Sequence, residues 1–295
     1  MPSFSTLVKR FILFIAVTAI TGLVIVTAQE ETPEPIGIPE NPDIYDVEIL
    51  VPEVIAVYPH DPDSYTQGLL LYEDGVFYES DGGSAPYGRQ SSLRRVDLET
   101  GEVLQQVDIN EDIFAEGLAL VDDRLIQLTW RAQAAVVFDR ETFEPIEIFE
   151  YFGEGWGLCY DGVALYMSNG SANITVRDPQ TFDPIRTFEV TVFDVPVEDL
   201  NELECVDGHV YANVWRTDTI VRIDMQTGIV DGVIDGSVLL SDEERASRLS
   251  NESDAVLNGI AYNPETGNFY LTGKLWPDLF EVRLVPRDEI SDLDE

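Results

Sequence analysis

Short apolar stretches alternate with polar turns along this chain, and the same arrangement occurs five times. Each unit opens with a polar or aromatic residue, then Gly or Glu, then Leu or Ile. The five motifs are Gln67-Gly68-Leu69, Glu116-Gly117-Leu118, Trp156-Gly157-Leu158, Asn201-Glu202-Leu203 and Asn258-Gly259-Ile260. A strand-like stretch begins at each motif, and a turn and a second, aromatic-rich stretch follow at 76–79, 125–130, 164–167, 209–215 and 268–276.

A third strand-like stretch follows in each unit, and in four units it ends in a matching hairpin. The hairpins read Asp-x-x-Thr followed by Gly or Phe, and they span 97–101, 139–143, 178–182 and 224–228. Units of roughly 40 to 57 residues built from short strands and tight turns are typical of β-propeller blades. The sequence therefore predicts an all-β fold, a five-bladed β-propeller.

The two ends of the repeat region predict how the propeller closes. The fifth unit has three strands of its own, the last from Leu279 to Leu284, whereas an unpaired strand pattern from Glu53 to Tyr58 precedes the first unit. We expect this N-terminal strand to close the last blade as its outer strand, because that pairing removes two exposed sheet edges.

The N-terminal region predicts a location outside the cytoplasm. Lys9 and Arg10 precede an apolar run from Phe11 to Val26, which is shorter than the ~20 residues of a typical membrane span. Residues 1–28 therefore form either a cleaved signal peptide of a secreted or periplasmic protein or a retained membrane anchor through residues 11–26. We expect a disordered linker rich in acidic residues and Pro at 29–46, the propeller at 47–285 and an acidic tail at 286–295.

A single insertion interrupts the strand pattern. Ser241 and Glu244 form a capping-box sequence ahead of 245–249, which predicts a short helix between the fourth and fifth units. This helix is either surface decoration or a lid near one end of the propeller axis.

Composition excludes several function classes. With 17 Lys and Arg against 56 Asp and Glu, the formal charge is −39, which makes nucleic acid a poor partner. Neither the two cysteines nor His60 and His209 have zinc-ligand spacing, so we expect no metal and no cofactor. Cys159 and Cys205 fall one position out of step in their units; we therefore expect their side chains on opposite strand faces, which disfavours a disulfide without excluding it. We expect a monomer.

The residues that open the five first strands are the candidate site. In a propeller these strands line the central channel, so Gln67, Glu116, Trp156, Asn201 and Asn258 should form a ring at one end of it. A structural ring would favour Val, Ala or Gly instead. The second strands end nearby at Trp130, Trp215, Lys274 and Trp276, which suggests a largely apolar site around one carboxylate and one ammonium. Such surroundings raise the pKa of Glu116 and suit it to acid–base work.

Longer motifs around these positions resemble a known family. Tyr65-Thr66-Gln67-Gly68-Leu69, Phe114-Ala115-Glu116-Gly117-Leu118, Glu154-Gly155-Trp156-Gly157-Leu158, Leu200-Asn201-Glu202-Leu203-Glu204 and Thr272-Gly273-Lys274-Leu275-Trp276 are similar to the plant and bacterial glutaminyl-peptide cyclotransferases. The resemblance runs from about residue 54 to 284. It implies a propeller enzyme that converts N-terminal glutamine of peptides or proteins to pyroglutamate and releases ammonia.

The resemblance also implies roles for individual residues. Glu116 is the implied acid and base, and Lys274, Asn201 and Gln67 are the other catalytic candidates. Phe114, Trp130, Trp156, Trp215 and Asn258 are the implied substrate-binding residues.

Two rival functions remain open from the residues themselves. Glu116, Asn201 and Asn258 offer oxygen ligands for Ca²⁺, as in lactonase-like propeller hydrolases, although Lys274 and the tryptophans disfavour a cation there. The other rival is a non-catalytic extracellular propeller that binds peptides or polymers through its outer faces.

Overall fold

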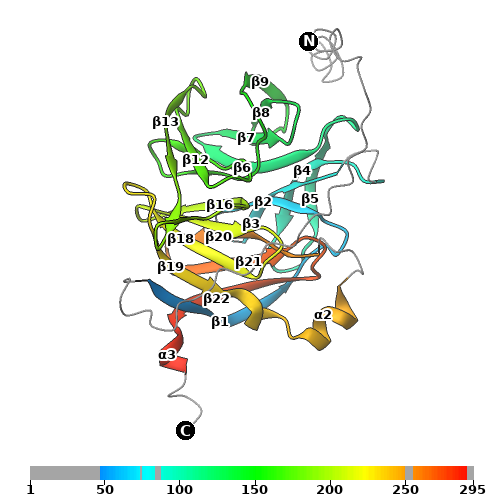
Figure 1. Cartoon of the computed structure of the whole chain (residues 1–295). Coiled ribbons are helices and arrows are strands. Elements are labelled where there is room, and N and C mark those ends of the chain that lie inside the picture. The colour runs from blue at the N-terminus through cyan, green and yellow to red at the C-terminus, as the bar shows by residue number, and fades with distance from the viewer. Residues whose placement is uncertain (1–46, 74, 84–87, 250–254, 291–295) are drawn as a thin grey trace, which may run out of the picture. The chain divides into compact units, whose positions relative to one another are not determined.

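In the computed structural model of the chain, residues 47–73, 75–83, 88–249 and 255–290 are described (Figure 1). Their strands form an all-β propeller of five four-stranded blades, as the repeats predicted. The predicted signal or anchor at 1–28, the linker at 29–46 and the end of the tail at 291–295 lie outside the described residues. Among the residues that are described, no helix is long and apolar enough to span a bilayer.

The first three blades are consecutive antiparallel meanders. Blade 1 contains β2 (Thr66–Tyr72), β3 (Val76–Asp81), β4 (Ser92–Asp97) and β5 (Val103–Asp108). Blade 2 contains β6 (Ala115–Val121), β7 (Arg124–Thr129), β8 (Ala134–Asp139) and β9 (Pro145–Glu150). Blade 3 contains β10 (Leu158–Tyr160), β11 (Leu165–Met167), β12 (Asn173–Arg177) and β13 (Pro184–Glu189).

The last two blades belong to one continuous sheet. Blade 4 contains β16 (Leu200–Val206), β17 (His209–Val214), β18 (Thr219–Asp224) and β19 (Val230–Asp235). Blade 5 contains β20 (Leu257–Asn263), β21 (Asn268–Gly273), β22 (Asp278–Pro286) and the N-terminal β1 (Glu48–Pro59). The short pieces between or after blades are β14 (Thr191–Val192), β15 (Val195–Pro196), the 3-10 turn η3 (Gly236–Leu239), α2 (Asp242–Arg248) and α3 (Arg287–Ile290).

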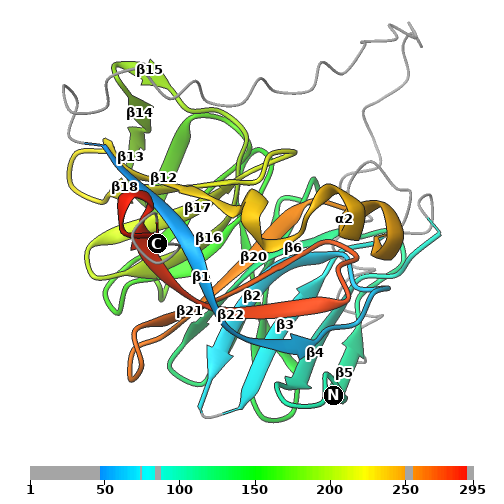
Figure 2. The same cartoon turned by 90° about the horizontal axis from the view of Figure 1, so that it is seen from below.

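Strand β1 closes the propeller as predicted and also joins blades 4 and 5. It runs antiparallel to β22 from Leu50, opposite Pro286, to Pro59, opposite Asp278, and the two strands lie side by side in Figure 2. Its first residues also pair in parallel with β19, where Glu48 lies opposite Gly232. The strand is therefore longer than the predicted 53–58, and its additional residues pair with the outer strand of blade 4 and cover that edge.

The repeated hairpins form because an Asp side chain accepts hydrogen bonds from the residues of the turn. In blade 1 the Asp97 carboxylate accepts hydrogen bonds from the Thr100 N–H at 2.9 Å and its hydroxyl at 2.7 Å. The residue after Thr100, Gly101, has a left-handed backbone with φ of 67°. The other three hairpins keep the same Asp and the same left-handed position. A short motif therefore defines the same strand connection four times.

The inner strands meet around the propeller axis in chain order. Strand β2 contacts β6, which contacts β10, followed by β16 and β20, and β20 contacts β2 again. Apolar clusters fill the space between neighbouring blades, for example between blades 3 and 4 around Ile174, Leu203 and Val221. This closed ring brings the starts of the five inner strands together. The predicted α2 begins at its capping box, in which Ser241 and Glu244 bond reciprocally.

Candidate active site

The five ring residues lie at equivalent places on the inner strands. Gln67, Glu116, Asn201 and Asn258 stand near the starts of β2, β6, β16 and β20, and Trp156 stands just ahead of β10. The four polar side chains are at most 5% exposed. Burial of four polar side chains at one repeat position costs free energy unless each finds hydrogen-bond partners in the protein or in a ligand.

The ring residues of neighbouring blades are fixed by contacts between their main chains. The Gly117 N–H donates to the Trp156 carbonyl at 2.6 Å, which joins blades 2 and 3. The Ser168 hydroxyl donates to the Asn201 carbonyl at 2.7 Å, which joins blades 3 and 4. A Cβ at Gly157 would lie 2.0 Å from that same carbonyl, so this glycine is required for the close approach.

Glu116 has an electrostatic environment that favours its protonated form. Burial raises the pKa of Glu116 well above its ordinary value. The Lys274 ammonium acts in the opposite direction, and the Glu154 carboxylate adds to the increase. An increase in this direction moves a carboxyl group toward the pH range in which an acid–base catalyst exchanges its proton.

Lys274 lies against an aromatic edge of the site. Its ammonium sits 4.8 Å from the centre of the Tyr65 ring, and Tyr65 packs edge-to-face on Phe114 at 6.0 Å. Phe114 in turn packs on Trp130 at 5.9 Å. Gly82 allows this approach, because a Cβ there would lie 2.7 Å from both Gln67 and Phe114. The lysine is almost fully buried, and the ring face of Tyr65 compensates part of its lost hydration.

Two further tryptophans form a second group of packed aromatic rings. Trp156 and Trp215 pack edge-to-face with ring centres 5.3 Å apart. Glu154 connects this pair to Trp130: its Oε2 accepts hydrogen bonds from the indole N–H of Trp130 at 2.8 Å and of Trp156 at 3.1 Å. Its Oε1 accepts from Arg131 at 2.8 Å. One carboxylate therefore fixes the orientation of two indole rings from neighbouring blades.

Several buried polar atoms of the ring and of the neighbouring end of β17 have no hydrogen-bond partner within the described residues. They are Oδ1 of Asn201, Oδ1 of Asn258, Nδ2 of Asn213 and Nε1 of Trp215. Asn258 uses its Nδ2 to donate to the Thr66 carbonyl at 2.8 Å and to Gln67 Oε1 at 3.4 Å. Unpaired buried acceptors and donors are costly in an isolated protein, so this set suits a polar ligand that supplies both kinds of hydrogen bond.

A second buried ionic cluster supports the Tyr65 and Lys274 side of the site. Glu79 accepts hydrogen bonds from Ser64 and Thr66 at 2.7 Å and contacts the His60 Nε2 at 3.1 Å. His60 Nδ1 contacts the Trp276 carbonyl at 2.6 Å. Despite burial, His60 and Arg94 lower the pKa of Glu79 to about 2.

The same cluster fixes the main chain on both sides of the site. Asp81 bonds Arg94 at 2.7 Å and accepts from the Tyr65 N–H at 2.7 Å. The Leu275 N–H donates to the Ser64 carbonyl at 2.7 Å. The residues that flank Tyr65 and Lys274 are therefore tied to one buried network.

Comparison with known proteins identifies the family. A family model described as glutamine cyclotransferase matches residues 19–284. The chain belongs to the glutamine cyclotransferase family. A glutaminyl-peptide cyclotransferase of Arabidopsis thaliana is 39% identical over 236 residues, which cover 79% of this chain and 71% of that relative. The crystal structure of Myxococcus xanthus glutaminyl cyclase has a TM-score of 0.74 and 39% identity, and the match covers 81% of this chain and 99% of that chain.

In this member of the glutamine cyclotransferase family, the sequence missed two residues of the site. Glu154 contacts Trp130 and Trp156, and Tyr65 contacts Lys274, yet the sequence assigned neither a role. Both lie within the motifs that carry the resemblance, so their position was the available signal. Trp276, in contrast, is a core residue: it is fully buried, packs on Phe280 and donates to the Ala255 carbonyl at 3.2 Å.

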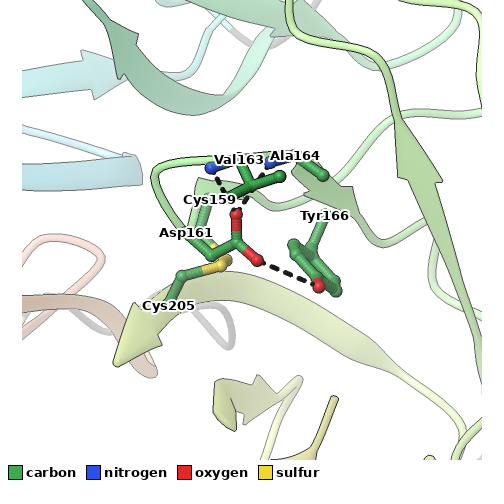
Figure 3. Close-up of a disulfide and its surroundings, with 6 residues drawn as sticks. All are labelled: Cys159, Asp161, Val163, Ala164, Tyr166 and Cys205. Atoms are coloured by element: carbon green, nitrogen blue, oxygen red, sulfur yellow. Dashed lines mark hydrogen bonds between the residues drawn. A yellow bond between two sulfur atoms is a disulfide. The ribbon is translucent and has the colours of Figure 1, made fainter. Parts of the chain in front are cut away.

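The sequence disfavoured a disulfide without excluding it, and the structure contains one. Cys159 on β10 and Cys205 on β16 form it, with Cα atoms 5.5 Å apart (Figure 3). Leu158 belongs to the apolar cluster between blades 2 and 3, whereas Cys159 next to it lies in the cluster between blades 3 and 4. Leu203 and Cys205 lie in that same cluster from the side of blade 4. Neighbouring blades pack face to face, so side chains on opposite faces of equivalent strands meet between them.

The turn next to the disulfide is closed by Asp161. Its carboxylate accepts from the N–H groups of Val163 and Ala164 at 2.7 Å and from the Tyr166 hydroxyl at 3.1 Å (Figure 3).

Within the described ranges, no three His, Cys, Asp or Glu side chains gather in a group that could hold a metal ion.

Proposed function

We propose that this protein converts the N-terminal glutamine of peptides to pyroglutamate with release of ammonia. The observation that carries the proposal is Glu116, a buried carboxylate at the ring of inner strands, whose pKa is raised by burial and lowered by Lys274, on the blade whose Phe114 and Trp130 pack on each other. Membership of the glutamine cyclotransferase family supports the same reaction.

The reaction needs no nucleophile from the enzyme. The neutral α-amine of the substrate attacks the carbon of its own side-chain carboxamide, which forms the ring C–N bond. Glu116, in its ionised form, takes a proton from the attacking nitrogen. The protonated Glu116 then gives this proton to the carboxamide nitrogen as the C–N bond to it breaks, and ammonia leaves. The carboxylate ends in its starting state, so one residue serves as both base and acid.

Other residues of the site bind and polarise the substrate in this proposal. Phe114, Trp130, Trp156 and Trp215 hold the glutamine side chain in its folded, ring-like conformation. Lys274 stabilises the negative charge that develops on the carboxamide oxygen. Gln67, Asn201 and Asn258 are buried carboxamides suited to the substrate's amine and amide groups, and the unpaired Oδ1 atoms of the two asparagines support that role.

The disulfide supports a location in an oxidising compartment. Disulfides persist outside the cytoplasm and are rare within it. Together with the apolar run at 11–26, the Cys159–Cys205 bond supports a protein that acts on secreted, periplasmic or cell-surface peptides.

Release of ammonia from a glutamine-led dipeptide by the purified chain tests the function. Glu116→Gln keeps the shape and some of the hydrogen bonding of the side chain but cannot accept a proton, so kcat should fall on the order of 10²- to 10⁴-fold. The acidic limb of the pH profile of kcat/KM should disappear with it. Glu150→Gln, at an exposed position on β9 of the same blade, is the matched control and should retain wild-type kinetics.

Two results would contradict the proposal at different levels. No ammonia from any glutamine-led peptide would remove the function itself. A Glu116→Gln variant with more than about a tenth of the wild-type kcat would leave the function but remove Glu116 as its acid and base, because the smallest expected effect is larger.

A further inference from the structure

Glu202 departs from its repeat, and this departure is the starting observation. Four units have glycine at this place, and the glycines let neighbouring inner strands touch: a Cβ at Gly68 would lie 2.6 Å from the Leu118 nitrogen, and one at Gly117 would lie 2.5 Å from the Leu158 nitrogen. The fourth unit carries a complete glutamate side chain instead, only 1% exposed.

The Glu202 carboxylate bridges three inner strands. Its Oε2 accepts from the Ile260 N–H on β20 at 2.8 Å, and its Oε1 accepts from the Leu69 N–H on β2 at 3.3 Å. Inner strands are the edge strands of their blades, so N–H groups on that edge need a partner other than a neighbouring strand. Glu202 supplies this partner to two blades while its own main chain belongs to a third.

The three bridged strands carry the three carboxamides of the ring. Asn201 directly precedes Glu202 on β16, Gln67 lies two residues before Leu69 on β2, and Asn258 lies two residues before Ile260 on β20. The other two ring members, Glu116 and Trp156, belong to blades already joined by the Gly117 N–H. The two oxygen atoms of Glu202 therefore connect the part of the ring that would otherwise depend on side-chain contacts.

We propose that Glu202 is a positioning residue that holds Gln67, Asn201 and Asn258 in one fixed arrangement for the cyclisation, an inference that rests on the proposed function. Both of its oxygens accept main-chain N–H groups, and the side chain is 1% exposed, so we assign it no contact with the substrate. Its contribution is to the geometry of the transition state rather than to proton transfer.

Glu202→Gln and Glu202→Gly separate this role from ordinary stability. In Glu202→Gln an NH₂ group replaces one acceptor oxygen and faces a main-chain N–H. Glu202→Gly introduces the residue that the other four units have and removes both acceptor oxygens. We expect kcat to fall about 10-fold in Glu202→Gln and about 10²-fold in Glu202→Gly, with KM changing less than about 3-fold, since displacement of a catalytic group by about 1 Å has effects of this size. Rates are compared per folded molecule, at a temperature well below the melting point.

Glu204→Gln is the matched control. Glu204 follows two residues later on the same strand, and burial raises its pKa to about 8 against the N–H groups of Tyr262 and Cys205. Its loss removes a half-buried carboxylate of the same strand that accepts from Tyr262 and Cys205 rather than from Leu69 and Ile260, so we expect kcat within about 2-fold of wild type. Ile174→Ala, a fully buried core change in blade 3, controls for destabilisation alone and should also keep its kcat.

Amide hydrogen exchange tests the contact without using the reaction. Exchange at Leu69 and Ile260 should accelerate at least 10-fold in Glu202→Gly and stay unchanged in Glu204→Gln. If exchange changes as expected while the wild type releases no ammonia, the proposed function fails and the contact stands. If kcat per folded molecule is unchanged in Glu202→Gly, or falls equally in Glu204→Gln or Ile174→Ala, the positioning role is overturned.

Discussion

Removal of the Cys159–Cys205 disulfide should destabilise the propeller by about 4 kcal/mol. The bond joins the inner strands of blades 3 and 4 across 46 residues of sequence. In the chain-entropy model, closing a loop of this length lowers the entropy of the unfolded chain by ~14 cal/mol/K, which corresponds to about 4 kcal/mol at 25 °C. Alanine at both positions keeps the surroundings of Cys159 apolar and buries no unpaired hydroxyl, so loop closure dominates the change.

Thermal unfolding of Cys159→Ala/Cys205→Ala measures the effect. Unfolding of the roughly 240 residues of the propeller has an entropy of ~0.5 kcal/mol/K, so 4 kcal/mol corresponds to a decrease in Tm of about 8 °C. The wild-type chain refolded under reducing conditions should show the same decrease, and reductant should leave the double variant unaffected. A decrease of less than about 2 °C would refute the reasoning, because loop closure would then lower the entropy of the unfolded chain by much less than the model requires.

Two further predictions concern the charged groups around the site. Lys274→Met should lower kcat/KM about 10²-fold and move the acidic limb of its pH profile to higher pH, because the Lys274 charge lowers the pKa of Glu116; a limb that stays in place would contradict this electrostatic coupling. His60→Gln should lower the Tm more at pH 5.5 than at pH 9. Burial opposes the charged imidazole, but Glu79 raises the pKa of His60 above 6.5. The stability that the His60–Glu79 pair contributes is therefore complete below pH 6.5 and is lost as the pH rises through the raised pKa. Glu79, with a pKa of about 2, stays ionised throughout, and Asp61 adds to the increase for His60, so an equal loss of Tm at both pH values would show that the imidazole does not titrate as an ion pair.

The blades were predictable from sequence because each blade is defined by local chemistry. The hairpin Asp, such as Asp97, bonds a Thr three residues away, so the motif and its structure occupy the same five residues. Closure by β1 also followed from counting strands, since the last blade lacked one. Its parallel pairing with β19 was not predicted, because no local pattern marks a strand that serves two blades.

The contacts that organise the site are long-range, and the sequence did not show them. Glu202 bonds residues 133 and 58 positions away, and Glu79 contacts a histidine 19 positions earlier. The disulfide was disfavoured for a related reason: the two cysteines occupy opposite faces of equivalent strands, and only the packing of blade 3 on blade 4 shows that these two faces meet. Residue type and repeat position were enough to place Glu116 in the ring, whereas partners from other blades required the folded chain.

The surroundings of three buried glutamates explain why the proton transfer is assigned to Glu116. Glu79 has hydroxyl, imidazole and guanidinium partners, and its pKa of about 2 keeps it ionised at any physiological pH. Burial and Glu204 raise the pKa of Glu202, but both its oxygens accept main-chain N–H groups of neighbouring strands. Burial raises the pKa of Glu116, the nearby Lys274 charge opposes that increase, and the residue stands at the start of β6 in the ring of inner strands. In the proposed reaction the same residue type therefore has three purposes, and we assign proton exchange to Glu116 from the hydrogen-bond partners of each carboxylate rather than from burial alone.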